Sequence, residues 1–176
     1  MGQLEASHIE AGILAKNIEE QKIERIRFEQ HRRTGIDIRG DSFTVASKNI
    51  SITDIEAVHP AGCGLSSVLA DRVTVQDSKV IGAGKYGLHL NPTSNATVIR
   101  NSVVDTGMNN RAGGSASAIT VRSFTADHEP ANVSTNLVEE NQVIRAANTG
   151  IFFSNDVGTT VNRNTVIRPC VRLTDC

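Results

Sequence analysis

The side chains best suited to chemistry are a histidine and two arginines that stand on copies of one repeated segment. His89 follows Gly87 by two residues, and Arg39 and Arg122 close two other copies. A histidine has an ordinary pKa of about 6.5, which suits a general base near neutral pH, and a guanidinium can neutralise a carboxylate. These groups together suit the removal of a proton next to a carboxylate, so we predict His89 and Arg122 as catalytic residues.

Further polar residues extend this set. The segment Asp127-His128-Glu129-Pro130 offers Asp127 and His128 as a second acid or base. Hydrolysis of a glycosidic bond needs two facing carboxylates, and Asp37 with Asp127 is the evident pair. We predict contacts with a bound ligand from the polar residues on the same segments, which are Asp37, Arg39, Asn91 and Thr120.

Each of these residues also has a plainer interpretation. His89 can be a surface histidine without a role. Arg39 and Arg122 can pair with Asp37 or a glutamate at the surface, an arrangement that contributes little to stability. The residue types therefore leave both interpretations open.

The segment that carries these residues recurs through the chain as a glycine or alanine followed by alternating residues. Its copies are separated by 23, 29, 23, 31 and 32 residues. They begin at Gly12, Gly35, Gly64, Gly87, Ala118 and Gly150. A period of this length is typical of solenoid proteins, in which each repeat forms one coil.

A second signal interleaves with the first. A short polar residue precedes an aliphatic pair at Asp77, Asn101, Asn141 and Asn164, and Asn101 and Asn164 each lie 14 residues after a repeat glycine. Residues at equivalent positions of stacked coils are vertical neighbours. We therefore predict that the three asparagines form a hydrogen-bonded ladder rather than a ligand site.

Each repeated segment alternates apolar and polar residues, which is typical of a β-strand with one buried face. Ile36 and Ile38 should point inward and Asp37 outward, and Leu88 and Leu90 inward and His89 outward. We predict two outward columns on one exposed ladder. The first contains Leu14, Asp37, Ser66, His89, Thr120 and Phe152, and the second contains Lys16, Arg39, a residue near position 68, Asn91, Arg122 and Ser154.

The repeats NSVVDTG, NQVIRAANTGIFF and NTVIRP resemble coils of the right-handed parallel β-helix proteins of the pectate-lyase-like superfamily. The resemblance covers roughly Gly12 to Arg168. It implies an all-β fold, a right-handed parallel β-helix of about six to seven coils. The same coil serves polysaccharide lyases, glycoside hydrolases, uronan epimerases, phage tailspikes and structural solenoids, so the fold alone does not define the activity.

The resemblance implies a polysaccharide as the partner. On a uronate glycan, Arg39 or Arg122 would neutralise the sugar carboxylate and His89 would take the neighbouring proton. The alternative is a structural or adhesion solenoid without catalysis, such as a tailspike segment. A homotrimer, as tailspikes form, would let a short stack bury its sides.

The chain divides into three parts. We predict an N-terminal cap at residues 1–11, a β-helix at 12–168 and a C-terminal tail at 169–176. The charged stretch 17–33 is either a strand and turn of the first coil, with Ile23, Ile26 and Phe28 inward, or one amphipathic helix through Glu29.

Three insertions lengthen the longer coils. They lie at Arg39–Lys48, Gly107–Ser117 and Ser123–Asn136, and the last two flank the strand Ala118–Arg122. Insertions gathered near one strand either mark a functional face or are loops lengthened by drift.

Charge and composition exclude several classes of function. A formal net charge of −1 gives no electrostatic reason to bind nucleic acid or an anionic membrane. Aromatic residues make up only 3%, so Tyr86, Phe152 and Phe153 are the only platforms for a sugar within the repeats. No apolar run has the length of a signal peptide or membrane helix. We expect a location outside the cell or on a virion surface, and an intracellular location or a longer parent chain stays open.

No metal or cofactor is expected. His31, His59 and His128 stand on different coils without the spacing of metal ligands. Calcium at a turn near Asp105, Asp127 or Asp156 is a weak alternative. Cys63 is predicted as a small core residue. Cys170 and Cys176 either close a small loop or are free thiols.

Overall fold

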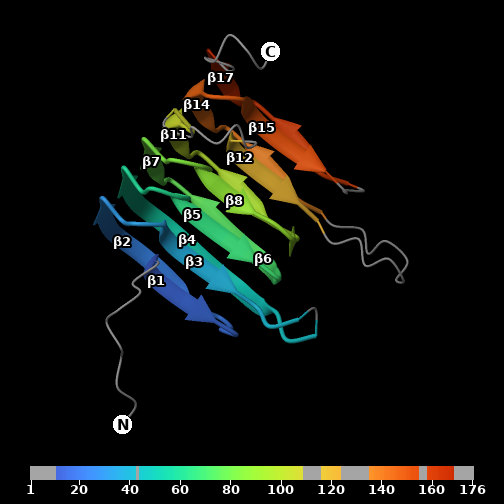
Figure 1. Cartoon of the computed structure of the whole chain (residues 1–176). Helices are drawn as coiled ribbons and strands as arrows, with labels where there is room; N and C mark the ends of the chain where they lie inside the picture. The colour runs from blue at the N-terminus through green and yellow to red at the C-terminus, as the bar shows by residue number, and fades with distance from the viewer. Residues whose placement is uncertain (1–10, 43, 109–115, 124–134, 155–157, 169–176) are drawn as a thin grey trace.

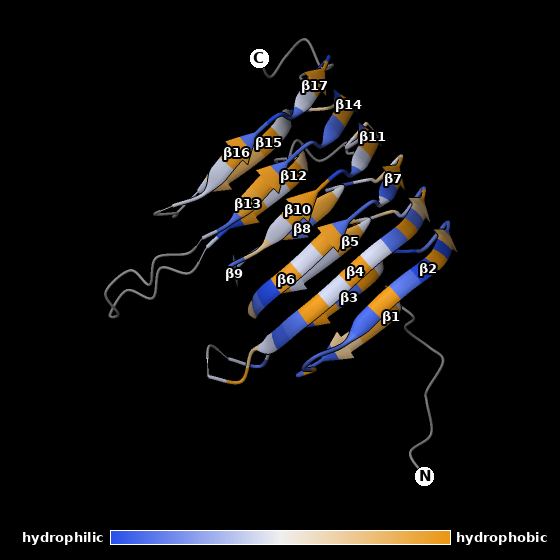
Figure 2. Cartoon of the chain, turned by 180° about the vertical axis from the view of Figure 1, so that it is seen from behind, coloured by the Kyte–Doolittle hydropathy of each residue, from blue (hydrophilic) through white to orange (hydrophobic). Residues whose placement is uncertain are grey.

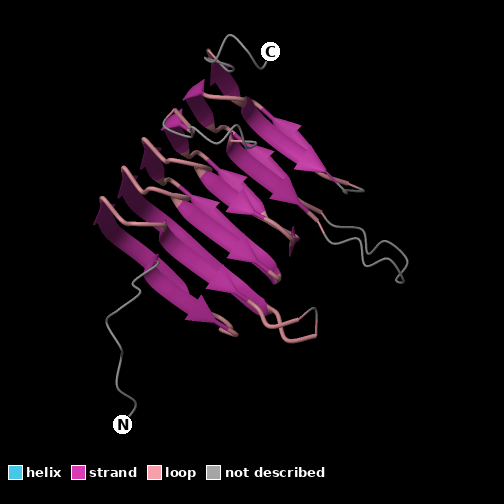
Figure 3. Ribbon diagram, viewed as in Figure 1, coloured by secondary structure: helices cyan, strands magenta, loops and turns pink. Residues whose placement is uncertain are grey.

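The structure is a computed structural model that describes residues 11–42, 44–108, 116–123, 135–154 and 158–168. These residues form strands and loops, and none of them lies in a helix (Figure 3). All of the strand pairs are parallel, and successive strands climb one above another along the molecule (Figure 1). The predicted parallel β-helix is therefore confirmed.

One face of the molecule is a six-stranded parallel sheet that takes one strand from each coil, and it is called the site sheet below. In spatial order it contains β1 (Ala11–Lys16), β3 (Thr34–Arg39), β5 (Leu65–Val68), β8 (Leu88–Leu90), β12 (Ser117–Arg122) and β15 (Thr149–Ser154).

The other strands form one bent sheet with two arms. The long strand β4 (Ser47–Val58) belongs to both arms, because it pairs with β6 in one and with β7 in the other. The first arm continues with β6 (Ala70–Gln76), β9 (Thr93–Ser94), β10 (Thr97–Ile99), β13 (Leu137–Glu139) and β16 (Thr160–Asn162). The second arm contains β7 (Lys79–Ile81), β11 (Ser102–Thr106), β14 (Gln142–Ala146) and β17 (Thr165–Ile167). Like β4, the strand β2 (Lys22–Glu29) runs through both arms, because it pairs with β4 along its length.

The core lies between these faces and is built from stacked aliphatic side chains. Alternate residues of a strand point to opposite faces, so apolar residues at every second position enter the coil interior. Figure 2 shows this alternation as bands of colour along β2 and β4. Successive coils of the site sheet, for example, bury Ile36, Leu65, Leu88 and Ile119.

The predicted asparagine ladder is confirmed. The backbone N–H of Asn101 donates to Oδ1 of Asn141 over 2.9 Å, and that of Asn141 donates to Oδ1 of Asn164 over 2.9 Å. Ser78 in the coil below continues the ladder, because its N–H donates to Oδ1 of Asn101. Ser78 lies 14 residues after Gly64, the spacing that Asn101 keeps from Gly87 and Asn164 keeps from Gly150.

Asp77 stands one position earlier, in a column of corner residues that turn the chain between the two arms. Asp77, Arg100, Glu140 and Arg163 all have φ between 49° and 54°. Left-handed backbone is costly for residues other than glycine and asparagine. The coil above nevertheless supplies a hydrogen-bond partner for the backbone at this corner, because the Asp77 N–H donates to the Ile99 carbonyl. The Asp77 carboxylate also accepts hydrogen bonds from Arg100 one coil above.

The first coil follows the strand interpretation of the sequence. Residues 22–29 form β2, Phe28 is buried, and Ile23 and Ile26 pack against the core. The alternative of an amphipathic helix is wrong. The proposed cap lies outside the described residues except for its last position, Ala11, where β1 begins, and the proposed tail lies outside them entirely.

Two other expectations concern loops and a cysteine. Arg39–Lys48 leaves the C-terminal end of β3 as predicted, whereas Gly107–Ser117 and Ser123–Asn136 lie mostly outside the described residues.

Cys63 is partly exposed, so its assignment to the core was wrong. Burial nevertheless raises the pKa of its thiol to about 11, so the thiol is protonated at neutral pH.

Candidate functional site

The first outward column of the site sheet has the predicted members. Leu14, Asp37, Ser66, His89, Thr120 and Phe152 are Cα partners of one another in that order. The second column pairs Lys16 with Arg39, Arg39 with Val68, and Arg122 with Ser154. Asn91 follows the end of β8, where its N–H donates to the Ser67 carbonyl over 2.8 Å.

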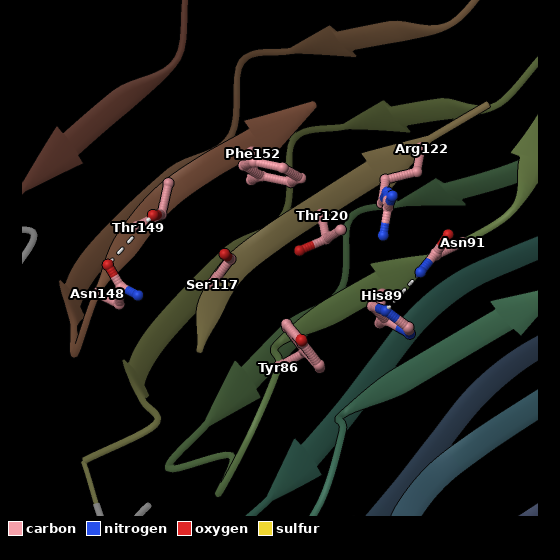
Figure 4. A pocket seen from close by; sticks show the side chains of 9 residues that line it. All are labelled: Tyr86, His89, Asn91, Ser117, Thr120, Arg122, Asn148, Thr149 and Phe152. Atoms are coloured by element: carbon pink, nitrogen blue, oxygen red, sulfur yellow. Dashed lines mark hydrogen bonds between the residues drawn. The ribbon is translucent and has the colours of Figure 1, made fainter. Parts of the chain in front are cut away.

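The upper half of this face holds a hollow of about 190 Å³. Four of the predicted residues line it, which are His89, Asn91, Thr120 and Arg122. Its other lining residues are Tyr86, Ser117, Asn148, Thr149 and Phe152 (Figure 4). We call this the sheet hollow. It spans β8, β12 and β15, so it depends on three coils being stacked.

Sequence reasoning named Tyr86 and Phe152 as sugar platforms and missed Ser117, Asn148 and Thr149. These three residues stand before the part of each strand in which apolar and polar residues alternate, so the alternation does not predict which way their side chains point. The sequence feature that could have identified them is their polar character just before a repeat glycine or alanine. Phe153, the third aromatic platform, does not line the hollow.

One wall of the sheet hollow is a stacked pair of rings. The imidazole of His89 lies against the phenol ring of Tyr86, with centroids 4.4 Å apart and planes at 18°. The Lys85 ammonium lies 5.3 Å from the centre of the Tyr86 ring. On the other side, Nδ2 of Asn91 lies 3.5 Å from Nε2 of His89.

This environment changes the protonation of His89. Burial, followed by the positive charges of Lys85 and Arg122, lowers the pKa of His89 to about 4. The expectation that His89 titrates near neutrality was therefore wrong. At neutral pH the ring is uncharged, and it offers one hydrogen-bond donor and one acceptor. It is also a weak base, because its affinity for a proton is low.

Arg122 supplies the positive charge of the sheet hollow. Its Nε donates to Oγ of Ser154 over 3.0 Å. In the part of the chain that the structure describes, no carboxylate forms an ion pair with it, whereas Arg100 pairs with Asp77 and Arg145 with Asp105. Arg122 therefore differs from these arginines in facing a hollow instead of a carboxylate.

Thr120 lies between His89 and Phe152 at the floor of the sheet hollow. Its side chain is only 3% exposed, and its Oγ1 has no hydrogen-bond partner. The prediction of an exposed Thr120 was wrong in this respect. A buried hydroxyl without a partner is costly.

Asp37 and Arg39 stand on β3, two coils below β8, and do not line the hollow. Nε of Arg39 donates to Oδ2 of Asp37 over 2.8 Å. Asp37 is 4% exposed and its Oδ1 has no partner, so the predicted exposed carboxylate is in fact buried and ion-paired. The plainer interpretation of Arg39 as a partner of Asp37 is confirmed.

The remaining predicted residues can be placed only in part. Asp127 and His128 lie outside the described residues, so their roles and the Asp37 and Asp127 pair stay predictions. Within the described ranges, no group of three His, Cys, Asp or Glu side chains could hold a metal ion. The carboxylate of Asp105, one of the weak calcium candidates, accepts hydrogen bonds from Arg145.

Comparison with models of known protein families agrees with the parallel β-helix that the structure shows. The family model of the right-handed β-helix region matches residues 5–166, so the chain belongs to this family. The predicted right-handed parallel β-helix is thereby confirmed. No curated protein and no solved structure matches the chain. In the described part of the chain, no helix is long and apolar enough to cross a membrane.

Proposed function

We propose that this protein binds an acidic polysaccharide along the outer face of the site sheet, with one sugar residue in the sheet hollow. The observation that carries the proposal is Arg122, a guanidinium that lines the sheet hollow and has no carboxylate partner in the described structure. A sugar carboxylate fits this guanidinium.

Two aromatic rings support a sugar as the ligand. Phe152 is 41% exposed, and it lies beside Thr120 on the next strand. Tyr86 lines the opposite part of the sheet hollow. Aromatic faces bind the apolar faces of sugar rings, and the polar residues between them orient the hydroxyl groups.

The size of the sheet hollow favours a chain ligand. Pockets that enclose small molecules have volumes of roughly 300–1,000 Å³, whereas this hollow has about 190 Å³. It therefore suits one unit of a polymer whose neighbouring units lie along the strands. Such a polymer is found in capsules and extracellular matrices, so we propose a location at a cell or virion surface.

Binding without turnover is the function that we propose. His89 has a pKa of about 4 and is a poor base for a sugar proton. The carboxylate of Asp37 is held by Arg39 below the hollow. Lyase, epimerase or hydrolase activity would need the residues of the Ser123–Asn136 insertion to complete the site. Membership of the pectate-lyase-like superfamily is a proposal that rests on the resemblance of the repeats.

A rigid spacer is the second candidate function. The ladders of Asn101, Asn141 and Asn164 stiffen the stack whatever it binds. In a spacer the sheet hollow would have no ligand, and a change of Arg122 would have no effect on glycan binding.

Titration calorimetry with polygalacturonate, alginate and neutral dextran tests the proposal. We expect heat of binding with the uronates only, and Arg122→Gln should weaken it about tenfold through loss of a charge-assisted pair. Arg100→Gln, which changes an arginine on a different face, is the matched control. Equal affinity of wild type and Arg122→Gln would overturn the site. New absorbance of unsaturated sugars would overturn the absence of turnover.

A further inference from the structure

A second positive charge stands beside the sheet hollow. Lys85 immediately precedes Tyr86, and its ammonium lies 5.3 Å from the centre of the Tyr86 ring. The backbone N–H of Lys85 donates to the Gly62 carbonyl of the coil below over 3.0 Å, whereas the residue as a whole is exposed. The stack therefore fixes the backbone of Lys85 and leaves its charge at the surface.

Lys85 and Arg122 share an unusual charge environment on the site sheet. In the described part of the chain, neither of them forms an ion pair, and no carboxylate is among the residues that line the sheet hollow. On β3, by contrast, Arg39 is paired with Asp37. The hollow therefore has two positive charges beside it that no ion pair of the described structure compensates.

The two cations stand at opposite ends of the hollow. Arg122 follows Val121, which is the partner of Leu90 at the C-terminal end of β8, whereas Lys85 precedes the start of β8. Figure 4 shows Tyr86, the neighbour of Lys85, at the opposite corner from Arg122. Lys85 and Leu90 are five residues apart, which is at most about 16 Å of extended chain. One sugar ring is too small to cover this span, and a chain of several rings can do so.

The stacked rings of Tyr86 and His89 connect the two charges. Their centroids are 4.4 Å apart, and both Lys85 and Arg122 are near enough to lower the pKa of His89. The imidazole is consequently neutral at neutral pH and adds no third charge. Neutral ring faces suit the apolar faces of sugars. A sugar chain over this ring pair would have a cation at each end.

The other direction on the site sheet offers less to an anionic chain. Below His89 in its column stand Ser66 and then Asp37. Arg39 is held by Asp37, and Oδ1 of this carboxylate has no hydrogen-bond partner. A sugar carboxylate placed here would meet a like charge instead of an available cation. The charges therefore favour a ligand that runs along β8 and β12.

We propose that Lys85 binds a second carboxylate of the same polysaccharide chain, which runs along β8 and β12 from Lys85 to Arg122. This inference rests on the function proposed above, in which Arg122 holds the first carboxylate. It defines the ligand more narrowly, as a polymer with carboxylates on several nearby units. An exposed ammonium is a weak contact by itself, but two contacts on one chain act together.

Calorimetry with hexagalacturonate tests the second contact. We expect Lys85→Gln to weaken the affinity about fivefold, the upper end of what an exposed ion pair contributes. Lys79→Gln removes the same charge from an exposed position on β7 and is the matched control, with unchanged affinity. Lys85 is exposed, so its variant should fold like the wild type, which an unchanged circular dichroism spectrum would verify.

A change in the ligand tests whether the carboxylate is what Lys85 binds. The methyl ester of hexagalacturonate has the same rings without the charges, so Lys85→Gln and the wild type should bind it equally. Comparing the two ligands with the two proteins isolates the interaction between the ammonium and the carboxylates. An equal loss of affinity for the charged and the esterified hexamer would overturn the proposed contact.

The galacturonate monomer tests the span, because its single carboxylate reaches one cation only. A titration that follows the Thr120 amide by nuclear magnetic resonance reports on the sheet hollow. Arg122→Gln should weaken monomer binding there, whereas Lys85→Gln should leave it unchanged. An equal loss in both variants would place the two cations on one sugar unit and overturn the span.

The two arginine and lysine variants also separate this inference from the function on which it rests. Weaker hexamer binding by Arg122→Gln, together with unchanged binding by Lys85→Gln, would overturn the second contact and leave the proposed function intact. Unchanged hexamer binding by Arg122→Gln would contradict the proposed function and this inference with it.

Discussion

Nε2 of His89 lies 3.5 Å from the amide nitrogen of Asn91, and the opposite side of the imidazole is stacked on Tyr86 at 4.4 Å. This position between an amide and an aromatic ring shields part of the imidazole from water. The ring is thereby kept neutral, because its charged form would lose hydration next to Lys85 and Arg122.

The lowered pKa of His89 predicts a dependence of stability on pH. Between pH 6.5, the ordinary value, and about 4, the unfolded state binds a proton that the folded state does not. The free energy of unfolding should therefore be highest above pH 6.5 and fall as the pH falls toward 4, by at most about 3 kcal/mol.

Urea denaturation of wild type and His89→Phe at several pH values checks this dependence. Phenylalanine keeps the stacking on Tyr86 but has no group that titrates. Between pH 4 and 6.5 the free energy of unfolding should therefore depend less steeply on pH in His89→Phe, by the amount that the uptake of one proton contributes. An equal slope in both proteins would show that His89 is protonated alike in the folded and unfolded states.

The asparagine ladder predicts a large cost for a small substitution. Asn141 is buried, and its Nδ2 donates to the Val98 carbonyl and to Oδ1 of Asn164 over 2.8 and 2.9 Å. Asn141→Ala leaves these acceptors and the Asn101 N–H without a side-chain partner. We expect a loss of about 3 kcal/mol in thermal or urea denaturation.

Asn162→Ala is the matched control for the ladder. Asn162 is exposed and donates to a glutamate at the surface, so its removal should cost less than about 0.5 kcal/mol. Similar losses in the two variants would contradict a special role of the ladder.

The two adjacent phenylalanines of β15 should differ in their effect on sugar binding. Phe152 lines the sheet hollow and Phe153 does not. Phe152→Ala should weaken uronate binding roughly fivefold through the loss of an aromatic contact. Phe153→Ala is the matched control and should leave the affinity for uronates unchanged. Calorimetry on both variants measures this, and equal losses of affinity would contradict the assignment of Phe152 to the site.

Gly87 predicts a steric limit between stacked coils. A Cβ at this position would lie 2.5 Å from the carbonyl oxygen of Ala118 in the next coil, closer than atoms can approach. Gly87→Ala should therefore force β8 and β12 apart and cost about 2 kcal/mol or more in urea denaturation. An alanine variant as stable as the wild type would show that the coils can separate locally without loss.

Much of the fold was predictable because side-chain direction alternates along a strand and coils stack with the period of the sequence. His89 was therefore assigned correctly to the column of Asp37 and Thr120. The three asparagines of the ladder were predicted, whereas Ser78 was missed because a serine does not resemble an asparagine. The 14-residue spacing from a repeat glycine, which Asn101 and Asn164 share, would have identified Ser78.

The sheet hollow was only partly predictable. His89, Asn91, Thr120 and Arg122 were grouped by register, whereas Ser117, Asn148 and Thr149 stand where the alternation has not begun. The burial of Asp37 was not visible either, because it depends on how the Arg39 side chain folds back over its own strand.

The sequence by itself determined the coil period, the inward and outward faces of each strand, and the asparagine ladder, since all three follow from the spacing of residue types. The tertiary structure decided which charges are paired and which are not. It set the low pKa of His89 and left Arg122 facing a hollow. These properties depend on side chains from neighbouring coils and on the water that they exclude, and no local pattern specifies them.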